Sequence, residues 1–285
     1  MKKFLSLCLA AATLTAGAVG MSACGGNDTL VVYTEAGFAP FEYLSDGQIV
    51  GVDVDIMNRV GEKLGRDVVF ENANFDIIID TVAEGRLTNV GAAGLSITDE
   101  RKEKVDFSVP YYTASLYVIY EVGGEGAPVI SQSGANGDVI YWDSLAGMNI
   151  GVQGGTTADL FLSDEIDGGV LQGSGAQKTS FTSLSVAVND IGNNINAVII
   201  DELPAQTLVA NNEGLACLPL YYKGATVAED EAAVDQYAIA VTKGQTEILD
   251  AINQVLNELM DDVDADGNNG IDRLVMQHLD LATGN

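Results

Sequence analysis

An arginine and an aspartate, each placed shortly after an apolar strand-like run, could bind the two charges of a small zwitterion. Arg101 follows the segment that ends at Ser96, and Asp201 comes directly after an apolar run. A guanidinium forms a planar, bidentate pair with a carboxylate, and a carboxylate binds an ammonium group. Simpler roles remain open, because Arg101 could pair with Asp99 or Asp106 on the surface. Asp201 could likewise cap the helix that is expected to follow it.

Glycines and hydroxyl side chains accompany both charged residues. Gly94 lets a ligand approach the backbone, and Ser96 offers a hydroxyl two residues later. Thr156 and Thr157 follow a strand-like run and two glycines, at a point where a helix should begin. The free N–H groups and the dipole of a helix N-terminus favour an anion. Threonine is also an ordinary helix N-cap, so this pattern is a weak signal by itself.

Three phenylalanines could form an apolar clamp. Phe38 and Phe41 lie in the loop after the first predicted strand, and Phe75 follows another strand in the same half of the chain. Two rings on opposite sides of a ligand bury a large area at a small entropy cost. All three could equally be core residues. For Phe41 we favour the core, because its neighbours Tyr43 and Leu44 are typical of a strand.

Alternating strand-like and helix-like segments must position these residues. The expected strands are 30–33, 68–70, 90–93, 149–152, 197–200 and 237–241. The expected helices are 56–64, 77–84, 98–105, 157–162, 183–191, 203–210 and 245–260. Segments 123–137 and 167–180 are rich in glycine and are predicted to be loops. The pattern starts over after the first of these loops, which predicts an α/β protein with two lobes around a cleft, where ligands bind beyond the carboxyl ends of parallel strands.

The first residues are typical of an export signal. Lys2 and Lys3 precede an apolar stretch that ends in small residues, so we expect residues 1–23 to be a signal peptide. The run Met21-Ser22-Ala23-Cys24 resembles a bacterial lipobox. It predicts lipid on Cys24, a short tether over 24–27 and an extracytoplasmic protein anchored to the cell membrane. The alternative is a plain secretory signal with an incidental cysteine.

The charge of the remaining chain excludes some partners. Without residues 1–23 the chain has 262 residues, of which 11 are basic and 41 acidic. Nucleic acid is excluded as a partner, because phosphate contacts need lysine and arginine. The charge also opposes adhesion to anionic lipid, so we expect membrane contact through the lipid anchor alone. An acidic, self-repelling surface is the simplest interpretation, and we expect a monomer.

Cysteine and histidine usage limits the chemistry further. Loss of the signal and lipidation of Cys24 leave Cys217 as a single thiol, so no disulfide is expected; its apolar surroundings predict a buried, inert side chain. His278 is the only histidine, which excludes a Cys/His metal cluster, and no cofactor is expected.

Segment 262–272 is similar to a calcium loop. Its possible ligands are Asp264, Asp266, Asn268 and Asp272. The bidentate glutamate of such loops is missing, so we favour a solvated acidic turn.

Several runs resemble, in the expected order, the family 3 extracellular solute-binding proteins, which are the polar amino-acid-binding proteins of ABC importers. The resemblance covers nearly the whole chain after Cys24, and the ordered set is more specific than any one motif. Segments 123–141 and 163–180 match poorly. The runs that carry the resemblance are 38–43 (FAPFEY), 51–55 (GVDVD), 92–101 (AAGLSITDER), 105–108 (VDFS), 110–112 (PYY), 151–157 (GVQGGTT) and 200–202 (IDE).

The resemblance implies a two-lobed periplasmic-binding-protein fold, the Venus flytrap, with two crossovers between the lobes. The first lobe would take residues 28–119 and 237–285, and the second residues 120–236. It also implies that the chain binds a free amino acid and delivers it, by lobe closure, to the permease of an ABC importer. The implied ligand-binding residues are Glu35, Phe38, Phe75, Gly94, Ser96, Arg101, Thr156, Thr157 and Asp201.

Each of these residues takes a role by analogy with the family. Arg101 would bind the α-carboxylate, helped by Ser96 and by Thr157. Asp201 would bind the α-ammonium, with the Gly94 carbonyl nearby. The rings of Phe38 and Phe75 would flank the ligand side chain, and Glu35 would contact its polar end, which suits arginine, lysine, histidine or glutamine.

Two other functions remain open from the sequence. Cyclohexadienyl dehydratases resemble these binding proteins, and an enzyme of that kind would need a general acid such as Glu35 or Glu202 in the cleft. The sequence offers no Ser–His–Asp or Cys–His arrangement, because His278 falls in the C-terminal helix. A sensor domain of a membrane receptor is the third possibility. We favour the binding protein over both.

Overall fold

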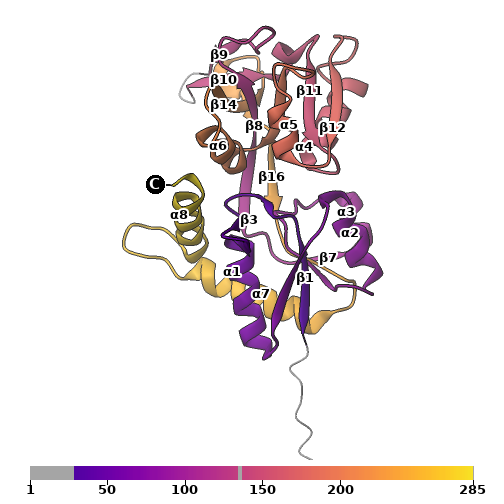
Figure 1. Cartoon of the computed structure of the whole chain (residues 1–285), viewed down its shortest axis with the longest axis vertical. Coiled ribbons are helices and arrows are strands. Elements are labelled where there is room, and N and C mark those ends of the chain that lie inside the picture. The colour runs from indigo at the N-terminus through magenta and orange to yellow at the C-terminus, as the bar shows by residue number, and fades with distance from the viewer. Residues whose placement is uncertain (1–28, 134–136, 285) are drawn as a thin grey trace, which may run out of the picture.

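The chain folds into two lobes joined by two neighbouring strands, as the computed structural model shows for residues 29–133 and 137–284 (Figure 1). The expectations for the signal peptide and for Cys24 fall outside the described residues. Both lobes combine a central sheet with helices, and each contains parallel strand pairs. The predicted α/β class with two lobes is confirmed. Within the described ranges, no helix has the length and apolarity needed to cross a bilayer.

The first lobe is built on a five-stranded sheet. Its strands are, in spatial order, β5 (Val68–Asn72), β1 (Leu30–Thr34), β6 (Val90–Gly91), β17 (Ala240–Val241) and β7 (Asp106–Phe107). The pairs β1–β5 and β1–β6 are parallel, whereas β17 runs antiparallel to both of its neighbours. A small antiparallel sheet stands beside it, made of β2 (Gly37–Phe38), β3 (Glu42–Ser45) and β4 (Gln48–Val50).

Five helices of the described part of the chain cover this lobe. They are α1 (Val52–Leu64), α2 (Phe75–Glu84), α3 (Asp99–Lys104), α7 (Thr246–Asp261) and α8 (Gly270–Thr283). The predicted end of α1 is confirmed, because Gly65 has a left-handed φ of 68° and its N–H caps the last turn. The apolar face of α7 buries Ile248, Ile252 and Leu256. Helix α8 lies beside α7 and reaches the second lobe, where the Asn211 amide donates to the Ala282 carbonyl (Figure 1).

The second lobe contains a larger sheet of mixed direction. Its order is β12 (Gln177–Phe181), β11 (Asn149–Gln153), β13 (Ala197–Asp201), β8 (Tyr112–Glu121), β14 (Leu215–Tyr222), β10 (Asp138–Tyr141) and β9 (Ile130–Gln132). Off this path, β15 (Glu231–Ala232) pairs with β14. The covering helices are α4 (Thr157–Asp167), α5 (Leu184–Asn189) and α6 (Glu202–Ala210), with short 3₁₀ turns at Trp142–Leu145 and Val227–Glu229.

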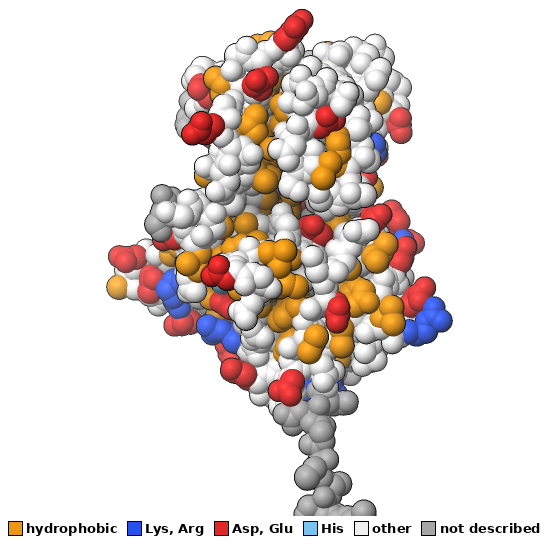
Figure 2. Space-filling model, viewed as in Figure 1, with side chains coloured by type: hydrophobic (Ala, Val, Ile, Leu, Met, Phe, Trp, Pro, Cys, Tyr) orange, Lys and Arg blue, Asp and Glu red, His pale blue; other side chains and the backbone are white. Residues whose placement is uncertain are grey.

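Two strands carry the chain between the lobes. The long strand β8 leaves the first lobe and continues into the second, and β16 (Val234–Tyr237) returns beside it. The two strands are antiparallel, with Tyr112 opposite Tyr237 and Ser115 opposite Val234. The surface narrows between the lobes near these strands (Figure 2). The predicted pair of crossovers is therefore a two-stranded antiparallel connection.

The structure differs from the sequence expectations at polar edge strands. Segment 177–181 is strand β12, although it falls within a predicted loop, and β9 falls within the other. Both lie at the two ends of the second sheet, and an edge strand can be polar because one side faces water. The expected strand 237–241 is split between β16 and β17, which belong to different sheets.

Candidate ligand-binding site

Arg101 is buried between the lobes. It lies in the first turn of α3, where the Thr98 side chain accepts a hydrogen bond from the Arg101 N–H, as expected for an N-cap. The residue is only 7% exposed. Its Nη1 donates to the Ser96 carbonyl at 2.6 Å, and its Nη2 donates to the Gly155 carbonyl of the second lobe at 2.8 Å. The alternative of a surface ion pair is wrong, since Asp99 pairs with Lys102 instead.

Asp201 comes from the opposite lobe and its side chain does not cap the following helix. It ends β13 and precedes α6, yet it makes no side-chain capping bond. The residue is 4% exposed, and its Oδ1 has no hydrogen-bond partner among the described residues. Burial raises the pKa of Asp201 well above its usual value and the charge of Asp235 raises it further, whereas the nearby Tyr237 hydroxyl, the Asp201 backbone N–H and the charge of Arg101 oppose the shift. Arg101 and Asp201 are therefore buried charges of opposite sign that come from different lobes.

Ser96 and Thr157 meet at the same place, from different lobes. Their hydroxyl oxygens lie 3.3 Å apart. Both hydroxyls donate to Oδ2 of Asp235, Ser96 at 2.7 Å and Thr157 at 2.5 Å. Asp235 belongs to β16, the strand that returns between the lobes. The sequence interpretation missed Asp235, because it placed the strand start at Tyr237 and treated the two preceding residues as the end of the second lobe.

Phe38, Phe41 and Tyr237 form an aromatic cluster beside Gly94. The Phe38 ring lies 6.1 Å from the rings of Phe41 and of Tyr237, and Phe41 lies 5.0 Å from Tyr237. Phe41 is fully buried, so its predicted core role is confirmed. Gly94 has a φ of +53°, and a Cβ there would lie 2.7 Å from the Phe38 ring. Only glycine can therefore bring this backbone so close to Phe38.

Phe75 is the first residue of α2, and its ring contacts the guanidinium of Arg101. The guanidinium carbon of Arg101 lies 5.6 Å from the centre of the Phe75 ring, within the range of a cation–π contact. Both residues line a recess at the edge of the interface, together with Asp76 and Gly155. The ring therefore supports the guanidinium in its present orientation, whatever else it contacts.

Glu35 and Thr156 have different surroundings. Thr156 is the N-cap of α4, since its hydroxyl accepts from the Asp159 N–H and donates to the Gln153 carbonyl at 2.8 Å. Its side chain is thus engaged in the ordinary capping role. Glu35 is partly buried, and burial raises its pKa, while the Gln153 side chain and the Gly37 N–H oppose the shift. Gln153 ends β11 of the second lobe, so Glu35 also faces the interface.

The structure thus brings most of the predicted residues to one interface and adds two that the sequence interpretation missed, Asp235 and Tyr237. A usable signal was present: an aspartate two residues before a tyrosine in a strand lies on the same face as that tyrosine. Tyr237 is fully buried, and its hydroxyl has no hydrogen-bond partner within the described part of the chain. Asp201, Asp235 and Tyr237 together leave three buried polar atoms unpaired.

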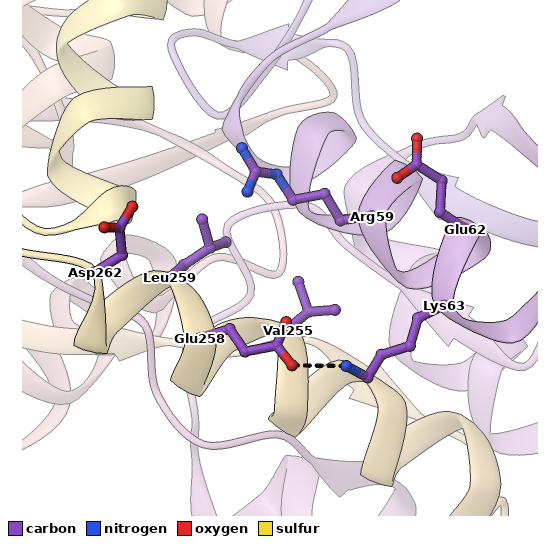
Figure 3. A pocket seen from close by; sticks show the side chains of 7 residues that line it. All are labelled: Arg59, Glu62, Lys63, Val255, Glu258, Leu259 and Asp262. Carbon is purple, nitrogen blue, oxygen red and sulfur yellow. Dashed lines mark hydrogen bonds and ion pairs between the residues drawn. The ribbon is translucent and has the colours of Figure 1, made fainter.

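A second, wider hollow lies away from this interface. It is a surface groove between α1 and α7, where Arg59, Glu62 and Asp262 surround an ion pair between Lys63 and Glu258 (Figure 3). No predicted site residue lines it. His278 is also remote from the cleft residues: its ring binds the Tyr43 hydroxyl and the Asp55 carboxylate, which attaches α8 to the first lobe.

The acidic segment 262–272 is organised by protein groups. Asp264 accepts the backbone N–H groups of Asp266 and Asn268, and Asp272 forms a capping box with Asn269 at the start of α8. Arg273 pairs with Asp262 and Asp264. Across residues 29–133 and 137–284, no three His, Cys, Asp or Glu side chains gather in a manner that suits a metal ion. Figure 2 shows acidic side chains spread over the visible face, in keeping with the 41 acidic and 13 basic residues of the whole sequence.

The chain is similar to amino-acid-binding proteins of known name. It is 27% identical to the arginine-binding extracellular protein ArtP of Bacillus subtilis, over 92% of this chain and 94% of that protein. It is 26% identical to the L-cystine-binding protein TcyJ of Escherichia coli, over 82% of this chain and 78% of that protein.

Solved structures give the same result. The amino acid ABC transporter substrate-binding protein AbpA of Streptococcus pneumoniae, bound to L-arginine, superposes with a TM-score of 0.72 at 28% identity, over 90% of this chain and 95% of that one. An ancestral arginine-binding protein bound to arginine gives a TM-score of 0.69 at 29% identity, over 87% of this chain and 97% of that one. These relatives are all named as binding proteins. The family description "Bacterial extracellular solute-binding proteins, family 3" matches residues 30–266, and the chain belongs to that family.

Proposed function

We propose that this protein binds a free amino acid between its lobes and delivers it to an ABC importer when the lobes close. The observation that carries the proposal is the burial of Arg101 and Asp201 on opposite sides of the interface between the lobes. One guanidinium from the first lobe and one carboxylate from the second interact across the interface, and both are nearly fully buried. A zwitterion has the complementary pair of charges, so it can contact both lobes only when they approach each other.

The roles of the individual residues follow from their chemistry. Arg101 binds the α-carboxylate and Asp201 binds the α-ammonium, near the carbonyl of Gly94. Ser96, Thr156 and Thr157 surround the carboxylate end. Phe38 and Phe75 flank the ligand side chain.

Glu35 contacts the polar end of that side chain. Burial raises the pKa of Glu35, so a cationic or hydrogen-bond-donating group beside it relieves the cost of its charge. The arginine-bound relatives are consistent with such a ligand.

The family supports the remaining parts of the proposal. Its members are extracellular, and the relative AbpA is named as part of an amino acid ABC transporter. We therefore place this chain outside the cytoplasm, held to the membrane by lipid on Cys24 after removal of residues 1–23, as a monomer whose partner is the importer permease. The lobes would comprise 28–119 with 237–285, and 120–236.

Two measurements test the function. A thermal-shift screen of the twenty standard amino acids should identify at least one that raises the melting temperature, because ligand at a hundred times Kd stabilises by about 2.7 kcal/mol. Small-angle scattering with that amino acid should give a smaller radius of gyration than without it. A screen in which no amino acid binds would contradict the proposal, and an unchanged radius at saturation would contradict closure.

A further inference from the structure

Asp235 lies on the connection between the lobes and faces the site. In strand β16 alternate residues share a face, so Asp235 lies on the same side as Tyr237. Tyr237 packs on Phe38 and lies against Gly94, whose hypothetical Cβ would be 3.5 Å from the Tyr237 ring. Val234 and Gln236, on the other face, are exposed. The strand therefore directs Asp235 toward the residues that we assign to the ligand.

One oxygen of Asp235 is fixed and the other is free. Oδ2 accepts from the hydroxyls of Ser96 and Thr157, which come from different lobes. Each hydroxyl has a single proton to donate, and these two are used on Asp235. Oδ1 is buried and has no hydrogen-bond partner among the described residues. The carboxylate is thus held in one orientation with an unsatisfied acceptor.

A second unsatisfied acceptor lies nearby. Oδ1 of Asp201 is also buried and unpaired, and Asp201 is 4% exposed. Asp201 lies opposite Leu116 and Asp235 opposite Ala114 on the two sides of β8, so their side chains leave the sheet on the same face. The charge of Asp235 accordingly raises the pKa of Asp201. Buried carboxylate oxygens without donors are costly, and two carboxylates on the same face also repel each other. A cationic donor between them would remove both costs.

We propose that Asp235 is a second ligand-binding carboxylate, and that the ligand's primary ammonium binds between Oδ1 of Asp201 and Oδ1 of Asp235. An ammonium has three donors, enough for both oxygens and one further acceptor. The proposal rests on the proposed function and deepens it. The site then contains three carboxylates, Glu35, Asp201 and Asp235, against the single guanidinium of Arg101. A zwitterion leaves this excess of negative charge unchanged, whereas an amino acid with a cationic side chain reduces it.

Because Ser96 and Thr157 both donate to Oδ2 of Asp235, they are positioning residues for that carboxylate. Their hydroxyl protons orient Asp235, so the ligand carboxylate depends mainly on Arg101 and on backbone N–H groups. Recognition of the ammonium therefore involves two carboxylates, while the ligand carboxylate has one charged partner. The protein should tolerate a change at the ligand carboxylate better than the loss of its amino group.

Calorimetric titration of three proteins with two ligands tests the proposal. The proteins are the wild type, Asp235→Asn and the control Asp250→Asn, which removes the same charge from an exposed position on α7. The ligands are L-arginine and its deamino analogue, 5-guanidinopentanoate. Asp235→Asn should weaken L-arginine at least about tenfold. The analogue should bind the variant as well as or better than the wild type, because the variant lacks an unpaired buried charge. Asp250→Asn should change both affinities by less than about threefold.

Other results would overturn the proposal in distinct ways. If Asp235→Asn binds both ligands more tightly, Asp235 competes with the ligand carboxylate and does not bind the ammonium. If L-arginine changes less than about threefold, Asp235 takes no part in binding. If the wild type binds L-lysine and not L-arginine, the same comparison uses L-lysine and 6-aminohexanoate. A wild type that binds none of the twenty amino acids contradicts the proposed function itself, and this inference with it.

A comparison on the wild type alone covers the case in which the variant does not fold. Argininamide keeps the ammonium and neutralises the carboxylate, whereas 5-guanidinopentanoate does the reverse. We expect the amide to bind more tightly than the deamino analogue. The opposite order would contradict the dominance of the ammonium, independently of any substitution.

Discussion

The guanidinium of Arg101 donates to the carbonyl oxygen of Gly155 at 2.8 Å, so a side chain of the first lobe is bonded to the backbone of the second. The same guanidinium bonds the Ser96 carbonyl of its own lobe. Burial lowers the pKa of Arg101, and the charges of Asp235, Glu100 and Asp201 oppose that shift. Arg101 therefore combines a contact that closes the interface with a charge that can hold an anion there.

Truncation of Arg101 should abolish most of the binding. In Arg101→Ala the ligand carboxylate loses a charge-assisted, bidentate partner, which costs about 3–5 kcal/mol, or two to four decades in Kd. Arg101→Lys should recover little, because an ammonium cannot reproduce the planar fork. Calorimetric titration with the amino acid found by screening measures both values.

A matched control separates this effect from the loss of one positive charge. Arg86→Ala removes a guanidinium that is 78% exposed and paired with Glu84. Its affinity should stay within about threefold of the wild type. If Arg101→Ala weakens binding by less than about tenfold, the assignment of Arg101 to the ligand carboxylate is wrong.

Gly155→Ala should oppose closure. A Cβ at this position would lie 3.2 Å from the Cα of Asp76 in the other lobe, and that backbone atom cannot rotate away. We expect a weakening of amino-acid binding by about three- to tenfold, and a larger radius of gyration at saturating ligand. Titration and small-angle scattering measure the two effects.

Two glycines serve as controls for this substitution. Gly155 has a φ of +79°, so alanine there is also strained. Gly147 has a φ of +74° with nothing within 4 Å of its hypothetical Cβ, so Gly147→Ala isolates the backbone strain. Gly154→Ala places a methyl at ordinary contact distance, 3.7 Å from the nearest atom. Equal loss of binding in Gly155→Ala and Gly147→Ala would show that strain, and not closure, is responsible.

The stability of the protein should rise as the pH falls from 6 to 4. Burial raises the pKa of Asp53 from 3.8 to about 6, against hydrogen bonds from Tyr111 and Gly94. The folded state therefore binds this proton more tightly than the unfolded chain, and protonation favours folding. Asp53 contributes a slope of at most about 1.4 kcal/mol per pH unit in this window. Burial also raises the pKa of Glu42, so its effect has the same sign.

Urea unfolding at several pH values measures this slope. Asp53→Asn should flatten it, even if the variant is less stable at every pH because asparagine cannot accept both hydrogen bonds. Asp250→Asn, an exposed position on α7, should keep the slope of the wild type. A slope that is identical in Asp53→Asn and the wild type would show that other groups cause it.

Cys24→Ser should release the protein from the membrane. If Cys24 carries the lipid, serine at this position cannot be acylated through a thiol and the only anchor is lost. Cell fractionation should then find the variant in the medium or in the soluble extracytoplasmic fraction, and the wild type in the membrane. Cys217→Ser is the control, since that thiol lies in β14. A Cys24→Ser protein that stays in the membrane would falsify the anchor.

The sequence was most informative where the chain alternates between apolar strands and amphipathic helices. Strands such as β13 are buried on both faces, so their residues form short apolar runs bounded by polar ones. The helix ends at Gly65 and Thr98 were predictable because a left-handed glycine and a hydroxyl cap have local causes. The edge strand β12 was missed, because its polar sequence reflects its place in the sheet and not a local preference.

The residues of the site also differ in how well the sequence predicted them. Arg101 and Asp201 could be singled out, since each is a charge at the end of an apolar run. Asp235 offered only the weaker signal of its spacing from Tyr237, because its role depends on hydroxyls 139 and 78 residues away along the chain. Which oxygen is fixed and which remains unpaired depends on the approach of two lobes, and only the folded structure gives that information.

The position of β17 in the first lobe has a consequence for the order of assembly during biosynthesis. This strand lies between β6 and β7, yet it begins at Ala240, after the whole second lobe has been made. A chain that emerges from its N-terminus can thus complete the second lobe while β7 still lacks its neighbour. The first lobe therefore begins to form before the second lobe but is completed after it. Its strands β6 and β7 are joined only when the two residues of β17, and then helix α7, have been made.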